Sequence, residues 1–109
     1  MLLSAILLLV AAKATNEYAR RLGESISRLL GLYLLTQAEL GREVGASPQT
    51  MTNIVRGQVE ARARTYQAIF EFFAMDRFIE DFEAALPEIL KSFPDVEKKA
   101  AAIRAKRSK

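Results

Sequence analysis

A short polar segment in the middle of the chain carries the side chains best suited to binding chemistry. From Ser47 to Gly57 the sequence reads SPQTMTNIVRG, in which Met51, Ile54 and Val55 recur at helical spacing. The positions that would then face outward are Gln49, Thr50, Thr52, Asn53 and Arg56. Gln and Asn can pair bidentately with adenine in a DNA major groove, and a Thr methyl can contact thymine. An ordinary solvated helix face would have a similar composition.

Catalytic and metal-binding groups are scarce. The 109 residues contain no Cys and no His, which excludes disulfides, thiolate and imidazole metal ligands, and Ser-His-Asp or Cys-His catalysis. The few glycines form no phosphate-binding loop. The nearest carboxylate pair, Glu80 with Asp81 or Glu83, has no nucleophile or metal cluster beside it. We therefore expect no enzyme activity, no metal and no cofactor.

Two short helices joined by a tight turn would position the polar face. Thr36 and Glu39 have the spacing of a capping box, which starts the first helix. Gly45 can adopt the positive φ that ends this helix and turns the chain. Ser47 can then cap the second helix, with Pro48 at its first position, where no N–H is needed. The sequence therefore predicts a helix-turn-helix.

An amphipathic helix should precede this motif. It would be capped by Thr15 or Asn16 and end near Leu35. Its apolar positions are Leu22, Ile26, Leu29, Leu30 and Tyr33. Gly23 and Gly31 within it indicate either the close approach of another helix or a simple propensity defect of about 1 kcal/mol each.

Two further helices are expected after the motif. The first carries an apolar stripe of core residues at Tyr66, Ile69, Phe70 and Phe73. The second would start at Asp76 and be kinked or restarted by Pro87, and Pro94 would close the ordered part. No alternating β pattern of useful length occurs, so the predicted fold is all-α.

The two ends of the chain differ from its middle. Residues 1–15 begin with the uncharged run Met1–Ala12, which is too short to cross a bilayer. It would form an additional apolar helix, buried or dimerising; a secretory signal and membrane association are alternatives. Residues 94–109 form a basic C-terminal tail, either a frayed solubilising end or a weak attraction to polyanions. Residues 16–93 would hold the helix-turn-helix domain.

The run from Thr36 to Gly57 resembles the phage-repressor-like helix-turn-helix family (Cro and lambda-repressor, xenobiotic-response-element type). The matching positions are Gln37, Leu40, Val44, Gly45, Met51, Ile54 and Gly57. Weaker similarity extends from about Leu22 to Phe73. The resemblance implies a lambda-repressor-like DNA-binding domain of four or five helices, with its motif at residues 37–57 and with additional N- and C-terminal helices.

The resemblance also implies roles for individual residues. Base contacts would come from Ser47, Gln49, Thr50, Thr52 and Asn53. Gln37 would bind a DNA phosphate and support Gln49, and Arg56 would reach the DNA backbone. The surplus apolar surface of Leu29–Leu35 suggests burial in a dimer.

These observations predict a cytoplasmic transcriptional regulator, a repressor that binds operator DNA as a homodimer and reads the major groove with helix 48–56. A different class of function is also open. The C-terminal part has a softer likeness to antitoxins, in which one chain binds a toxin protein and represses its own operon. The acidic stretch Glu71–Glu97, a poor DNA surface, would then face the partner protein.

Overall fold

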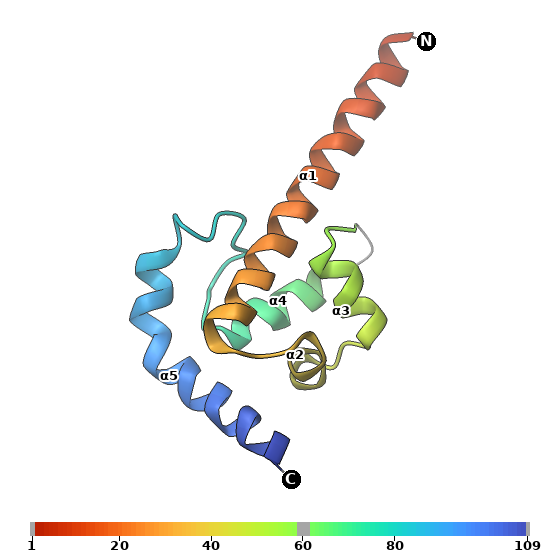
Figure 1. Ribbon diagram of the computed structural model, residues 1–109. Helices are drawn as coiled ribbons and strands as arrows, with labels where there is room; N and C mark the ends of the chain where they lie inside the picture. The colour runs from red at the N-terminus through yellow and green to blue at the C-terminus, as the bar shows by residue number, and fades with distance from the viewer. Residues whose placement is uncertain (1, 59–61, 109) are drawn as a thin grey trace.

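The computed structural model describes the backbone of residues 2–58 and 62–108 and the side chains of residues 17–58 and 62–107. Over those backbone ranges the chain is all-α, as the sequence predicts, and has no strand. The elements are α1 (Leu2–Tyr33), α2 (Gln37–Val44), α3 (Pro48–Val55), α4 (Ala63–Phe72), α5 (Leu86–Ala105) and the 3₁₀ turn η1 (Lys106–Ser108) (Figure 1).

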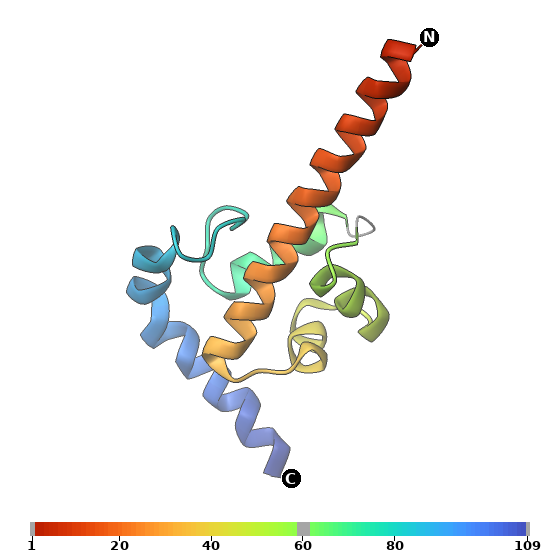
Figure 2. The same cartoon turned by 45° about the horizontal axis from the view of Figure 1, so that its top comes forward.

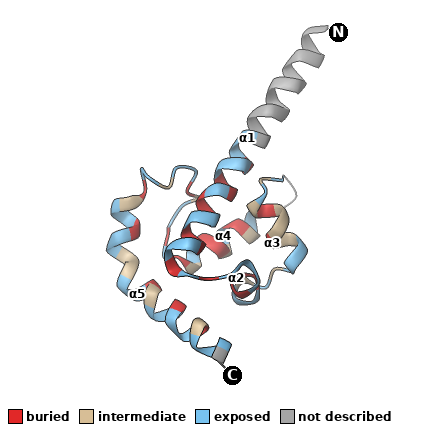
Figure 3. Ribbon diagram, in the orientation of Figure 1, coloured by how far each residue is buried: buried red, intermediate tan, exposed pale blue. Residues whose placement is uncertain are grey.

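One apolar core joins the helices, because each helix turns its buried side toward the others (Figure 3). The largest fully buried side chains are Leu22, Ile26, Leu29, Tyr33, Leu40, Met51, Ile54, Ile69, Phe70, Phe73, Ile79 and Ile89. The apolar stripes predicted for the helix before the motif, for α3 and for α4 therefore do face the core. The C-terminal end of α5 comes close to the junction between α1 and α2 (Figure 2).

The first helix runs without a break from Leu2 to Tyr33, so the expected helix start at Thr15 or Asn16 is wrong. Thr and Asn can cap a helix, but neither Gly nor Pro precedes them to end an earlier one. The side chains of residues 1–16 lie outside the described part, and so do the roles predicted for Met1–Ala12. Within the described residues, the structure contains no helix with the length and apolar character that a bilayer crossing requires.

The helix expected from Asp76 is also wrong, because residues 73–85 form an irregular loop. Ala74 ends α4 in the left-handed region, with φ +61°, and the following Met75 donates its N–H to the Phe70 carbonyl at 2.8 Å. Ile79 is fully buried and anchors the loop to the core. Ile79, Phe82 and Leu86 have the spacing of a helix, although the chain between them is not helical.

Pro87 lies in the first turn of α5, and it neither kinks nor restarts a helix, because residues 73–85 before α5 form a loop. Pro94 does not close the ordered part, contrary to expectation, since α5 continues through it to Ala105. A proline inside a helix costs about 3 kcal/mol. Beyond it, Val96, Ala100 and Ile103 bury a stripe at helical spacing, and buried Val and Ile side chains stabilise by about 1.5–3 kcal/mol each. This burial offsets the cost of the proline.

Tyr33 places a hydroxyl in the apolar core. Its ring stacks on those of Phe73 and Phe93, with centroids 5.6 and 5.3 Å away. Among the described residues its hydroxyl oxygen has no hydrogen-bond partner. Burial, followed by the charge of Glu97, raises the pKa of Tyr33.

Replacing Tyr33 with Phe should therefore raise the free energy of unfolding by about 1 kcal/mol, because the change removes a buried polar group that lacks a partner. Urea titration followed by circular dichroism measures the difference. Tyr66, whose hydroxyl is buried in the same way, provides a second test through Tyr66→Phe. A loss of stability above 0.5 kcal/mol in both variants would contradict this reasoning.

Candidate nucleic-acid interface

The predicted capping box starts α2. The Thr36 hydroxyl accepts the N–H of Glu39 at 3.1 Å, and the Glu39 carboxylate accepts the N–H of Thr36 at 2.9 Å. At the other end, Gly45 has φ +73° and donates its N–H to the Gly41 carbonyl. Both ends of α2 are thus set by residues within or next to it, as the sequence predicts.

The turn passes directly into α3. Ser47 caps this helix by accepting the N–H of Thr50 at 3.1 Å, and Pro48 lies in its first turn. Met51 and Ile54 are fully buried and fix its inner side. Gly41 allows α2 and α3 to pack closely, because a Cβ there would lie only 2.9 Å from the Ala46 carbonyl oxygen. The predicted pair of helices and its turn are therefore present.

All seven residues predicted to contact DNA lie at the surface of the protein. Ser47, Gln49, Arg56 and, on α2, Gln37 are exposed. The other three, Thr50, Thr52 and Asn53, are half-buried. Four of the seven share one helix face by their i, i+3, i+4 and i+7 spacing, namely Gln49, Thr52, Asn53 and Arg56.

Hydrogen bonds within α3 order its polar side chains. The Gln49 amide nitrogen donates to the Asn53 side-chain oxygen at 2.9 Å. The Ser47 hydroxyl donates to that of Thr50 at 2.9 Å, and the Thr52 hydroxyl donates to the Pro48 carbonyl at 3.0 Å. These bonds reduce the rotamer freedom that a partner would otherwise have to restrict on binding.

Two arginines at the C-terminal end of the chain contact the start of the motif and the residues just before it. Arg107 forms an ion pair with Glu39, in which its Nε lies 2.7 Å from a carboxylate oxygen, and it also donates to the Leu34 carbonyl at 2.7 Å. Arg104 donates to the Tyr33 carbonyl and pairs with Glu97. Arg104 therefore binds the last carbonyl of α1 and Arg107 the carbonyl of the residue that follows it; carbonyls at a helix end lack partners inside the helix.

The Glu39 carboxylate is almost fully buried and stays ionised. The hydrogen bond from Arg107 and, after it, those from Thr36 lower the pKa of Glu39 to about 2, although burial raises it. This pair was not predicted from the sequence, since its members are separated by 68 residues. No spacing rule could have found it. The basic end of the chain is thus attached to the motif and is not a frayed tail.

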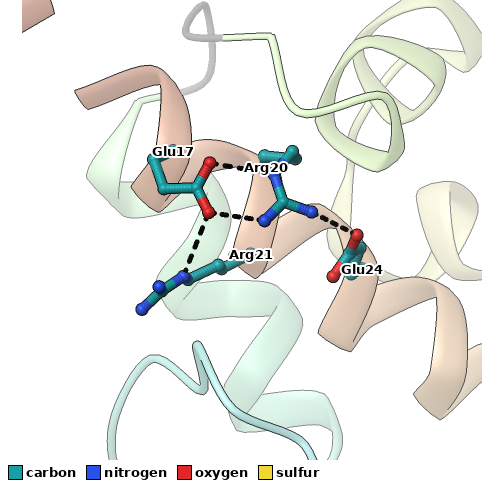
Figure 4. A network of polar contacts seen from close by, with 4 residues as sticks. All are labelled: Glu17, Arg20, Arg21 and Glu24. Carbon is teal, nitrogen blue, oxygen red and sulfur yellow. Dashed lines mark hydrogen bonds and ion pairs between the residues drawn. The ribbon is translucent and has the colours of Figure 1, made fainter. Parts of the chain in front are cut away.

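A second group of charges covers α1 near the end of α3. Arg20 bonds Glu17 at 3.0 Å and pairs with Glu24, while Arg21 lies 3.4 Å from Glu17 (Figure 4). Arg20 in particular lowers the pKa of Glu17 to about 2. Because these charges compensate one another on an exposed surface, they supply little positive potential to a neighbouring ligand.

Two of the carboxylates considered as an acid and base pair have neighbouring polar partners. Asp81 accepts the N–H of Ala84 at 3.2 Å, which stabilises a turn, and Glu83 lies 3.7 Å from Arg28. Within the described residues no group of three or more acidic side chains could hold a metal ion. The exposed face of α3 is thus the arrangement with the clearest potential for recognition. Comparisons with protein-family models, curated proteins and solved structures found no match to this chain.

Proposed function

We propose that this protein is a sequence-specific DNA-binding transcriptional regulator of the phage-repressor-like type, with a lambda-repressor-like arrangement of its helices. The observation that carries the proposal is α3, which buries Met51 and Ile54 while its opposite side exposes Gln49 and Arg56. A short helix held by a preceding helix and a tight turn fits a major groove.

The roles follow from position on the motif. Gln49 and Asn53 read base edges, and Ser47, Thr50 and Thr52 lie beside them. Gln37, exposed at the start of α2, and Arg56, at the end of α3, bind phosphates and fix the register of the helix on the duplex.

Charges around the motif support binding to a polyanion. Arg42, Arg56, Arg62 and Arg64 are all exposed. Glu39, which would oppose them, is neutralised by Arg107. Affinity should therefore fall with rising salt, because each phosphate contact releases counterions.

A homodimer would place two copies of α3 in successive major grooves about 34 Å apart. The operator would then be a pseudo-palindrome. Occupying it would block polymerase, so the protein would act as a repressor without performing any chemistry.

The Gln49→Ala variant tests the proposal. It should weaken binding to the preferred site by about 1–3 kcal/mol and relax the preference at one base position, because a bidentate contact is lost. Fluorescence anisotropy with DNA selected from a random pool measures both effects. Gln67→Ala on α4, another exposed glutamine, is the matched control and should bind like the wild type. Equal affinity and base preference in the Gln49 and Gln67 variants would rule out the assigned role.

A second candidate, an antitoxin that binds a toxin protein and represses its own operon, is favoured by an acidic hollow beside α5. The hollow, of about 480 Å³, is lined by Asp76, Glu88 and Asp95 together with Ala74, Lys91 and Ser92. An acidic surface suits a basic protein partner better than DNA. Co-purification of a stable second chain would support this function, and its loss in Asp95→Lys would locate the contact.

A further inference from the structure

We infer that this protein reads A·T base pairs, and that the 5-methyl group of thymine is one of the contacts that α3 makes. The inference rests on the proposed function, and it narrows the ligand from DNA in general to operators with A·T pairs at the positions that α3 contacts.

The hydroxyl protons of Ser47 and Thr52 are already engaged. Thr52 donates its proton to the Pro48 carbonyl at 3.0 Å. Ser47 donates its proton to Thr50 and accepts the Thr50 N–H, so its hydroxyl serves the cap. At its half-buried surface position Thr52 can therefore offer a base its methyl group and the acceptor lone pairs of its oxygen. A methyl on the protein matches the methyl that only thymine presents in the major groove.

The side-chain amide of Gln49 is complementary to adenine, the base that pairs with thymine. Gln49 is exposed, and its side-chain nitrogen donates one hydrogen to Asn53 at 2.9 Å. A primary amide has two donors and two acceptor lone pairs, so Gln49 keeps a donor and its carbonyl oxygen. Adenine presents the complementary pair, the N7 acceptor and the N6 donor.

Readers of guanine and cytosine are missing from α3. The helix, Pro48–Val55, contains neither the Arg or Lys that pairs with guanine nor the Asp or Glu that accepts from cytosine. Arg56 follows only at the C-terminal cap, two turns after Gln49, and the first residues of a recognition helix are those that contact base edges. Apart from hydroxyl groups, which do not discriminate between base pairs, the side chains of α3 offer carboxamide and methyl groups, and these together match A·T pairs.

The experiment has two steps. The purified full chain first selects sites from a random pool of duplexes, and the positions whose preference Gln49→Ala relaxes are identified. We expect A·T pairs there. Deoxyuridine then replaces each thymidine of the selected half-site in turn, which removes one methyl group without changing any hydrogen bond. Losing a buried methyl contact should weaken wild-type binding about fourfold at one position or more.

Thr52→Ser is the matched variant, because serine keeps the hydroxyl and removes only the methyl. It should bind the thymidine site about fourfold more weakly than the wild type and lose its sensitivity to deoxyuridine at the contacted position. Thr65→Ser on α4 should keep that sensitivity. Guanine or cytosine at the positions relaxed by Gln49→Ala, or wild-type affinity indifferent to every deoxyuridine replacement, would overturn the inference while leaving DNA binding intact. If the pool yields no bound DNA, the proposed function and the inference both fail.

Discussion

Gly23→Ala should destabilise the domain by about 2 kcal/mol and reduce DNA binding with it, despite alanine being the better helix former. Gly23 lies on α1 directly against the C-terminal end of α3. A Cβ there would lie 2.4 Å from the Ile54 carbonyl oxygen and 2.8 Å from that of Val55. Both atoms belong to the backbone and cannot rotate away, so α3 would have to move as a unit.

The direction of the stability change caused by Gly23→Ala follows from comparing two effects. Alanine gains about 1 kcal/mol over glycine inside a helix. Overpacking a tight contact costs about 1–3 kcal/mol, occasionally more, and a 2.4 Å approach to backbone belongs at the upper end of that range. The steric cost therefore exceeds the gain. Gly57, at φ +78°, is also close to α1, because a Cβ there would lie 2.6 Å from the Cα of Arg20.

Gly31→Ala is the matched control, because a Cβ at Gly31 would meet nothing within 4 Å. It is on the same helix and should raise stability by up to about 1 kcal/mol. Urea unfolding of both variants, followed by circular dichroism, gives the comparison. Equal shifts in the same direction would mean that α1 and α3 do not approach as closely as described.

Removing the charge of Glu39 should destabilise the protein about as much as Gly23→Ala does. Glu39→Gln should lower the free energy of unfolding at pH 7 by about 2 kcal/mol, since it weakens hydrogen bonds between charged groups in a buried position. Glu43→Gln, on the same helix but exposed, should change stability by less than about 0.5 kcal/mol. The two variants lose the same formal charge, so their difference reports the specific contacts of Glu39 with Arg107 and Thr36 rather than the change in net charge.

This contribution of Glu39 should also depend on pH. Its pKa is about 2 in the folded protein against an ordinary value of 4.5, so between these values the unfolded chain binds the proton more readily. Stability therefore rises with pH across that window. The contribution is complete above about pH 5 and is lost as the pH falls from 4.5 through 2. The stability difference between the wild type and Glu39→Gln, measured by urea unfolding at pH 7, 4 and 3, should shrink accordingly. A constant difference would show that ionised Glu39 contributes nothing specific.

The sequence alone determined the local structure of the candidate interface. The capping box of Thr36 and Glu39, the turn at Gly45 and the cap at Ser47 depend on atoms three or four residues apart. The exposed side of α3 followed from helical periodicity, since Met51 and Ile54 had to be buried. These features could be predicted because their causes lie within one or two helical turns.

The tertiary structure decided everything that depends on residues far apart in the chain. Pro94 predicted a helix end, yet burial of Val96 and Ile103 continues α5 past it, and the apolar spacing after Asp76 imitated a helix in a loop. Gly23 could equally have been a helix defect until its distance to α3 was known. The ion pair of Arg107 with Glu39 joins residues that are 68 positions apart in the sequence. Only the packing of the helices between them brings the two charges together, so no local sequence rule could predict the contact.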